Sequence, residues 1–416
     1  MEQSKHQYNE ELSRGYSTPP DNLVCSCHFG DECIVKYIRE NSKKGICHYC
    51  SQETEVKHLK QLVDFLFPKI YRYYGKIEDQ CLPVANSWLD KDDIEGGFPY
   101  HDCCNLLLPD DRQAFDVESL LSEVGLEIEN TQLFKDIKNC FDDSTMYSLK
   151  NPMYETKDEE LSYMWTRFCD IVKTKRRFTF FTMSEFSNEQ NCVNGLDNIL
   201  SELGKAVINE KLLTTIDCNK TIYRCRVHNT IKNINKFEDL VSPPNEYATQ
   251  NRMSPAGISM FYGSFDEITA IKEVKNQITE GLSVTVGTFS AKLPLKVIDF
   301  TKLPIELSIF GNYDYNTVLF LRSFTNDISR VVNPEEKTEY IPTQIITEYF
   351  RYVFVDNLNE SAVGIVYKSA ANPNANCCVL FLDNDKCAEY LTLKSTKKYD
   401  QILTVRDNEN GNVLQI

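Results

Sequence analysis

The sequence predicts an α+β protein whose mostly helical amino-terminal half is followed by a mixed α/β domain. Three observations lead to this prediction. Cysteine and histidine gather between residues 25 and 50, apolar residues recur at helical spacing from about 55 to 210, and β-rich runs dominate beyond about 218. At roughly 150 residues per domain, the 416 residues allow two or three domains.

Composition excludes several classes of protein. The hydrophobic share of 42% is that of a folded globular chain, and 45 Lys and Arg against 61 Asp and Glu leave a net charge of −16. Such an acidic chain is not expected to bind nucleic acid. No apolar run reaches the ~20 residues of a membrane helix, and no secretion signal opens the sequence. We therefore expect a cytoplasmic location and no membrane contact.

The polar residues 1–20 end in a Pro19-Pro20 pair and are expected to form a flexible arm. Two short Cys/His pairs follow within residues 21–55, Cys25-x2-His28 and Cys47-x2-Cys50. Such spacing turns both side chains inward, and four N/S ligands are typical of a closed, structural zinc site. We expect a zinc-ribbon-like segment, with Cys27 as the substitute for His28. The alternative is a small hairpin that carries reduced thiols.

Residues 56–215 are expected to form a helical domain. Val56, Leu59, Leu62, Val63 and Leu66 have the spacing of an amphipathic helix, which Pro68 should bend or end. Similar spacing predicts helices over 117–124, 133–137, 161–172 and 196–203. The basic cluster at 173–177 is interpreted as a solvated helix end rather than a nucleic-acid patch.

The second domain is expected over residues 218–390, with a carboxyl-terminal tail over 391–416. Its β-rich runs lie at 221–227, 258–262, 282–289, 364–367 and 377–382. Between the second and third runs, Ser264 and Glu267 have the spacing of a capping box that opens a helix. This junction should bring Arg252, Tyr262 and Glu273 close together.

At these residues the sequence resembles the RES family, whose members act on NAD as bacterial toxins and have a fold related to ADP-ribosyltransferases. The resemblance rests on TyrArg at 223–224, ArgMetSerProAlaGly at 252–257, Tyr262 with Ala270 and Glu273, TyrIleProThrGln at 340–344, and GlyIleValTyrLysSer at 364–369 with AsnCysCysValLeuPhe at 376–381. The amino-terminal part resembles the companion HEPN/RES amino-terminal domain, with His28 in place of a second cysteine. The Arg/His spacing of HEPN ribonucleases is absent from the sequence, so ribonuclease activity is not expected.

The resemblance implies an NAD+ site built on arginines. A guanidinium group stays charged and matches phosphate oxygens with two parallel hydrogen bonds. Arg224 and Arg252 are therefore expected to bind the pyrophosphate, with Arg226 as a third candidate because it shares a strand face with Arg224. No GxGxxG or P-loop sequence is present, so NAD+ is expected as a substrate rather than as a redox cofactor.

The other candidates surround the bond that breaks. Tyr262 offers a ring to stack on nicotinamide and a hydroxyl to orient the ribose. Glu273 is expected to hold the ribose and to offset the positive charge that develops on it, as a carboxylate does in glycoside hydrolysis. Ser369 is expected to donate a hydrogen bond in the pocket, and Gln344 is a secondary contact for adenine or nicotinamide.

The leading hypothesis is a RES-type toxin that releases nicotinamide from NAD+ by hydrolysis or phosphorolysis. The alternatives are a mono-ADP-ribosyltransferase that modifies a protein target and a non-catalytic, zinc-containing binding module. Expected partners are NAD+ and a cognate antitoxin or regulatory protein, while the sequence leaves oligomerisation open.

Overall fold

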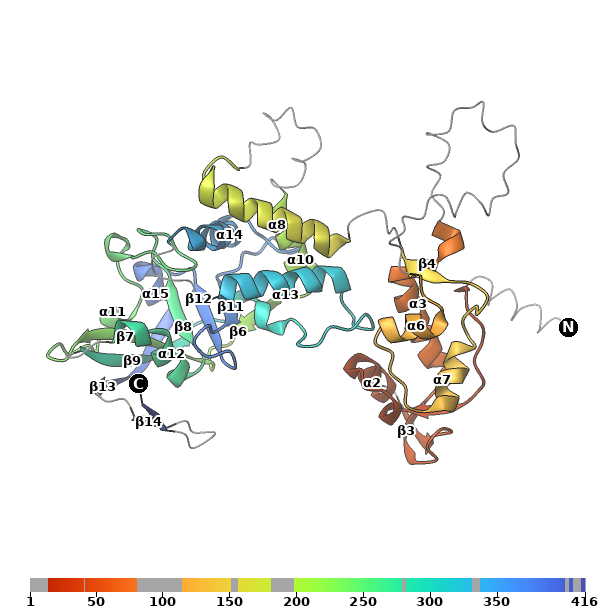
Figure 1. The fold of residues 1–416 in the computed structure, drawn as a ribbon. Helices are drawn as coiled ribbons and strands as arrows, with labels where there is room; N and C mark the ends of the chain where they lie inside the picture. Colours follow the sequence, from red (N-terminus) through yellow and green to blue (C-terminus); the bar gives the residue numbers. More distant parts are fainter. Residues whose placement is uncertain are drawn as a thin grey trace, which may run out of the picture. The chain divides into compact units, whose positions relative to one another are not determined.

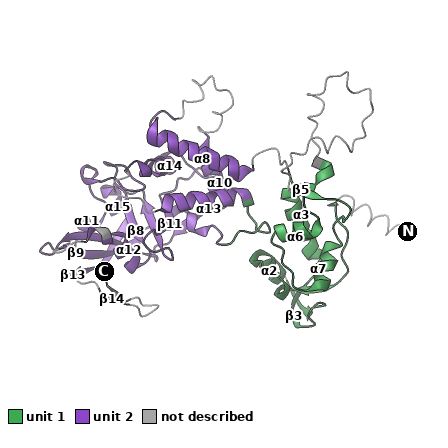
Figure 2. Ribbon diagram, in the orientation of Figure 1, with its two compact units in different colours: residues 1–155, 306–315 green, residues 156–305, 316–416 purple. Residues whose placement is uncertain are grey.

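The computed structural model describes residues 14–40, 42–80, 114–150, 156–180, 198–278, 282–330, 337–400, 404–406 and 413–415. The chain forms two compact units (Figures 1 and 2). Unit 1 comprises residues 1–155 and 306–315, and unit 2 comprises residues 156–305 and 316–416. The domain boundaries expected from the sequence lie at 20, 55, 215 and 390. They differ from this division into two units and remain proposals.

Unit 1 is a helical unit with two small sheets. Its helices are α2 (Glu32–Arg39), α3 (Leu59–Tyr73), α6 (Val117–Glu123) and α7 (Thr131–Lys138), and its strands are β1 (Leu23–Cys25), β2 (Lys43–Ile46), β3 (Glu53–His58), β4 (Tyr74–Lys76) and β5 (Tyr147–Leu149). The strands β1, β3 and β2 form an antiparallel sheet in that order, and β4 pairs with β5.

The amphipathic helix expected after residue 55 is α3, whose apolar face is buried. Val56 belongs to β3 instead, and Pro68 lies inside α3, so the helix does not end there. The first described residues of the expected arm also contact this core, because Tyr16 is buried with its ring centroid 4.5 Å from that of Phe67. Residues 1–13 lie outside the described residues.

Unit 2 is built on an eight-stranded sheet with the order β13-β9-β7-β8-β12-β11-β10-β6. The strands are β6 (Leu213–Ile216), β7 (Thr221–Asn229), β8 (Phe261–Ser264), β9 (Leu282–Ala291), β10 (Leu295–Asp299), β11 (Gly364–Lys368), β12 (Asn376–Leu380) and β13 (Leu391–Asp400). Only β10 and β11 pair in parallel among these neighbours. A small separate pair is formed by β14 (Thr404–Arg406) and β15 (Val413–Gln415).

Helices cover both faces of this sheet. They are α8 (Lys157–Thr174), α10 (Ile199–Asn209), α11 (Phe237–Leu240), α12 (Glu267–Glu273), α13 (Tyr315–Ser329), α14 (Ile341–Tyr352) and α15 (Asn384–Tyr390). Ile365 and Tyr367 of β11 pack in the core formed with α8, α10, α13 and α14, whereas the intervening Val366 packs in a core on the other face. This alternation is that of a strand covered on both sides.

The predicted α+β fold class is confirmed, and two details differ from expectation. Helices α8 and α10, which the periodicity placed in the amino-terminal helical block, pack in unit 2. The strand expected at 258–262 is β8 at 261–264, and residues 391–400 form β13 on the sheet. Within the described residues, no helix has both the length and the apolar character needed to cross a bilayer.

Candidate functional site

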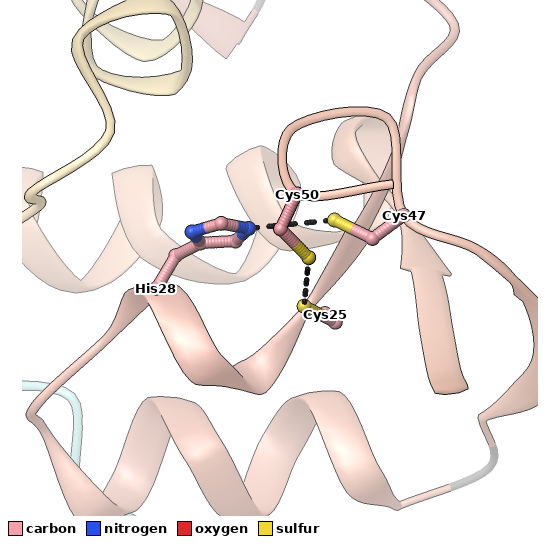
Figure 3. A group of neighbouring side chains, drawn as sticks. All are labelled: Cys25, His28, Cys47 and Cys50. Atoms are coloured by element: carbon pink, nitrogen blue, oxygen red, sulfur yellow. Dashed lines mark hydrogen bonds between the residues drawn. The ribbon is translucent and has the colours of Figure 1, made fainter. Parts of the chain in front are cut away.

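Four side chains of unit 1 form a group that could hold a metal ion (Figure 3). They are Cys25, His28, Cys47 and Cys50, whose ligand atoms all lie within 4.8 Å of one another. Cys25 ends β1, and Cys47 follows β2, so the small sheet holds the two pairs side by side. The group is the one that the sequence spacing predicts.

The donor set and its geometry fit zinc. Sγ of Cys25 lies 3.6 Å from Sγ of Cys50, and Nε2 of His28 lies 3.4 Å from Sγ of Cys47. Ligand atoms about 2.3 Å from a tetrahedral Zn²⁺ are separated by about 3.7 Å, close to these distances. Sγ of Cys27 lies 3.0 Å from Sγ of Cys25, but Cys27 is exposed and falls outside the four-residue group.

The thiols of this group differ electrostatically. Burial raises the pKa of Cys25. At Cys47 burial acts in the same direction, but hydrogen bonds from the Tyr49 backbone and from His28 hold the pKa below its usual value. A zinc ligand must be a thiolate, so the hydrogen bonds at Cys47 favour the form that binds metal.

Unit 2 contains a pocket of about 380 Å³. Its walls come from β7, β8, α12, the segment 243–260 and the adjoining ends of β11 and β12. Four of the residues singled out in the sequence line it: Arg224, Arg226, Tyr262 and Glu273. Residues 38 positions apart in the chain therefore meet here because β7 and β8 are neighbours in the sheet.

Arg224 and Arg226 bring positive charge to the pocket, and no carboxylate of the described residues pairs with either of them. Nη1 of Arg224 donates to the carbonyl of Tyr262 (2.7 Å), and Nη2 of Arg226 donates to the carbonyl of Val241 (2.8 Å). The buried Nε atom of each has no hydrogen-bond acceptor within the described residues. Burial, with a smaller contribution from Arg226, lowers the pKa of Arg224 to about 9, so it remains cationic at neutral pH.

Tyr262 is half-buried, and its hydroxyl lies 3.0 Å from Oγ of Ser254. Burial raises the pKa of Tyr262 to about 12, so the phenol is neutral at physiological pH. Ser254 belongs to the ArgMetSerProAlaGly motif at 252–257, for which the sequence analysis named no contact with Tyr262. The spacing of Ser254 and Tyr262 along the chain does not predict this contact, because a loop lies between the two residues.

Glu273 ends α12 and receives a hydrogen bond at Oε1 from the hydroxyl of Ser369. The same oxygen lies 3.6 Å from Sγ of Cys377. Oγ of Ser369 in turn accepts hydrogen bonds from the backbone N–H groups of Ala371 (3.1 Å) and Asn372 (3.0 Å). Two donors at its lone pairs leave the hydroxyl hydrogen directed at Glu273.

The helix start that positions Glu273 differs from expectation. The residue that caps α12 is Asp266, whose carboxylate accepts from the N–H of Thr269 (2.7 Å), so a capping box of Ser264 and Glu267 is wrong. Oγ of Ser264 instead accepts from the N–H of Asp266 (3.2 Å). Asp266 is as good a cap as Ser264, and the strand simply continues to residue 264 before the turn.

Arg252, Gln344 and Ser369 do not line the pocket. The guanidinium of Arg252 donates to the carbonyls of Ser329 (3.2 Å) and Arg330 (3.1 Å) at the end of α13. Nε2 of Gln344 donates to the carbonyl of Asn251 (2.8 Å). Arg252 and Gln344 therefore fasten the turn at 251–254, while the substrate roles expected for them remain predictions.

The fold and the two sites together define a class of protein. It combines a helical unit, which carries a Cys/His group that could hold a metal ion, with a mixed-sheet domain whose pocket holds paired arginines and a glutamate hydrogen-bonded by a serine. The model of the RES domain matches residues 221–400, and the model of HEPN/RES N-terminal domain 1 matches residues 40–186. The chain carries a HEPN/RES N-terminal domain and a RES domain, which confirms the resemblance stated from the motifs. No curated protein matches the chain.

The two matches divide the sites unequally. The RES match contains every residue of the pocket, whereas the HEPN/RES match begins at residue 40 and so contains Cys47 and Cys50 but not Cys25 or His28. The four-residue group that could hold a metal thus joins residues on both sides of the start of that match.

Proposed function

We propose that this protein is a RES-type toxin enzyme that cleaves the bond between nicotinamide and ribose in NAD+. The observation that carries the proposal is the pair Arg224 and Arg226, cations that line a pocket and whose buried Nε atoms find no acceptor in the part of the chain that the structure describes. Buried guanidinium groups are costly unless an anion pairs with them. A dinucleotide pyrophosphate supplies two negative charges next to a sugar that the carboxylate of Glu273 can reach.

The chemistry needs positioning more than proton transfer. As the glycosidic bond breaks, its electron pair moves to the pyridinium nitrogen and nicotinamide leaves as a neutral molecule. The ribose carbon becomes electron-poor, and the Glu273 carboxylate stabilises that charge. Water or inorganic phosphate then bonds to the carbon, and water loses its proton to solvent. The products are ADP-ribose or its 1″-phosphate.

Ser369 serves this step as a positioning residue. Its hydroxyl donates to Oε1 of Glu273, while two backbone N–H groups hold the hydroxyl in place. A carboxylate restrained in this way keeps its orientation as charge develops beside it. Tyr262, whose hydroxyl contacts Ser254, lines the same pocket as Glu273.

The metal proposed for Cys25, His28, Cys47 and Cys50 is one structural Zn²⁺. Three thiolates and an imidazole complete a tetrahedron, so no coordination position remains for substrate. The bound ion would tie β1 to the end of β2 and stabilise unit 1. No catalytic step is assigned to it.

The decisive experiment measures free nicotinamide after purified protein is mixed with NAD+. We expect release by the wild type and a loss of about 100-fold or more in Glu273→Gln, because the carboxylate is removed with little change of shape. Glu389→Gln is the matched control, since Glu389 is exposed on α15 and does not line the pocket. Folded wild-type protein that releases no nicotinamide, with or without phosphate, would overturn the proposal.

Product analysis identifies the acceptor. ADP-ribose indicates hydrolysis, ADP-ribose-1″-phosphate indicates phosphorolysis, and an ADP-ribosylated polypeptide indicates a mono-ADP-ribosyltransferase. Induced expression should also lower cellular NAD+ and arrest growth, and Glu273→Gln should prevent both effects. Growth arrest that persists in Glu273→Gln would separate toxicity from the proposed reaction.

A further inference from the structure

One aromatic side chain that lines the pocket is largely exposed. Tyr247 ends the short 3-10 helix η5 (Asn245–Tyr247) and lines the pocket, yet it is 70% exposed. Within the described residues its side chain has no hydrogen bond and no ring contact. A tyrosine left uncovered at a pocket wall offers a flat apolar surface that a ligand can cover.

The backbone beneath Tyr247 is well fastened. The carboxamide oxygen of Asn245 accepts from the N–H of Ser259 (3.1 Å), and the hydroxyl of Ser259 donates to the carbonyl of Pro243 (2.6 Å). The carbonyl of Ala248 accepts from the N–H of Gly257 (2.9 Å). Hydrogen bonds to residues 257–259 therefore hold the backbone both before and after Tyr247.

The contacts of the two arginines indicate which end of the pocket each half of a dinucleotide would occupy. Arg224 bonds the carbonyl of Tyr262, next to the helix that carries Glu273, whereas Arg226 bonds the carbonyl of Val241, six residues before Tyr247. The two arginines lie two residues apart on β7, which separates them by about 6.6 Å along the strand. A pyrophosphate bound across them would point one nucleoside toward Glu273 and the other toward the segment of Tyr247.

We propose that Tyr247 is the stacking platform for the adenine base of NAD+, at the end of the pocket opposite Glu273. This inference rests on the proposed function, because it assigns the second half of the same substrate. The ring binds the base through its face and makes no contact with the reacting atoms. Tyr247 is accordingly a residue for substrate affinity and for selection of dinucleotides over the nicotinamide half alone.

The test separates affinity from catalysis. Tyr247→Ala is expected to raise the KM for NAD+ by about 5- to 100-fold, the range typical of one base-stacking contact, with kcat nearly unchanged. Tyr247→Phe keeps the ring and should stay close to the wild type. Tyr352→Ala is the matched control, because Tyr352 is 67% exposed on α14 and does not line the pocket.

Inhibition by the two ends of the substrate locates the contact. AMP should inhibit the wild type, and its inhibition constant should rise in Tyr247→Ala by the same factor as the KM, while that of nicotinamide should not change. An unchanged KM in Tyr247→Ala, a Tyr247→Phe variant as weak as Tyr247→Ala, or equal changes for AMP and nicotinamide would each overturn the inference. So would a wild type that AMP does not inhibit. Failure of the proposed function is seen separately, as wild-type protein that releases no nicotinamide, and it removes both proposals.

Discussion

Arg224 and Arg226 illustrate a conflict between stability and binding at the scale of single residues. Arg224 is buried and Arg226 is half-buried, and each leaves a buried Nε without an acceptor within the described residues. Such groups destabilise the ligand-free fold because desolvation is not compensated. A protein keeps this arrangement where the missing partner arrives with a ligand, so stability and ligand response should change in opposite directions on substitution.

Replacement of Arg224 by methionine tests this conflict. Arg224→Met retains the aliphatic volume and removes the charge, so the free energy of unfolding without ligand should rise by about 1–3 kcal/mol. ADP-ribose at 100 times its Kd should add about 2.7 kcal/mol to the wild type but nothing to the variant. Urea unfolding with and without ADP-ribose measures both effects. Arg351→Met is the control, since buried Nη1 of Arg351 also lacks an acceptor but the residue does not line the pocket. A control that loses the response to ADP-ribose would contradict this account.

Ser369 should act through Glu273 and not on the substrate. Ser369→Ala removes the hydrogen bond that the Ser369 hydroxyl donates to Oε1 of Glu273, so kcat for nicotinamide release should fall about 10- to 100-fold while the KM for NAD+ changes little. Ser369→Thr keeps a hydroxyl and should recover much of the rate. Steady-state kinetics of the three proteins check this. A KM that rises as much as kcat falls, or no recovery in Ser369→Thr, would show a different role.

At the scale of elements, the sequence predicted local features better than it predicted contacts between distant segments. The pairs at 25–28 and 47–50 were predictable because two-residue spacing confines both side chains to one turn, and the four side chains do form a cluster that could hold a metal ion. Period two placed Arg224 and Arg226 on one side of a strand, and both line the pocket. By contrast, the carbonyls that hold Arg252 and Gln344 belong to α13 and to the turn at 251–254, and no spacing along the chain reports which helix ends meet there.

The zinc ligands can be distinguished by substitution. Purified wild-type protein should contain about one Zn²⁺ per chain, and both His28→Ala and Cys47→Ser should lose it, because a tetrahedral site with three ligands binds far more weakly. Cys27→Ser is the matched control and should keep its zinc, since Cys27 is exposed outside the group. Elemental analysis after dialysis gives the metal content. Loss of zinc in Cys27→Ser together with retention in His28→Ala would show that Cys27, and not His28, is the fourth ligand.

At the scale of the whole molecule, the two units are not two successive halves of the chain. Residues 306–315 follow β10 in the sequence and end at Tyr315, the first residue of α13, yet they belong to unit 1. Phe310 is 1% exposed in the unit 1 core, Nζ of Lys69 donates to the carbonyl of Gly311 (2.6 Å), and Arg72 forms an ion pair with Asp314. Unit 1 therefore depends on a segment encoded within the RES match, and a chain cut after residue 155 would lack part of its core.

This dependence predicts opposite effects for two phenylalanines ten residues apart. Phe310→Ala should destabilise unit 1 by about 3–5 kcal/mol, the usual result of truncating a buried phenylalanine. Phe320, equally buried but in the core of unit 2, is the matched control. Amide hydrogen exchange reads each unit separately. Phe310→Ala should lower protection in α3 about 100-fold or more and spare β9, whereas Phe320→Ala should do the reverse. Loss of protection in β9 alone on Phe310→Ala would mean that residues 306–315 stabilise the RES domain, and the division into units would have to be redrawn.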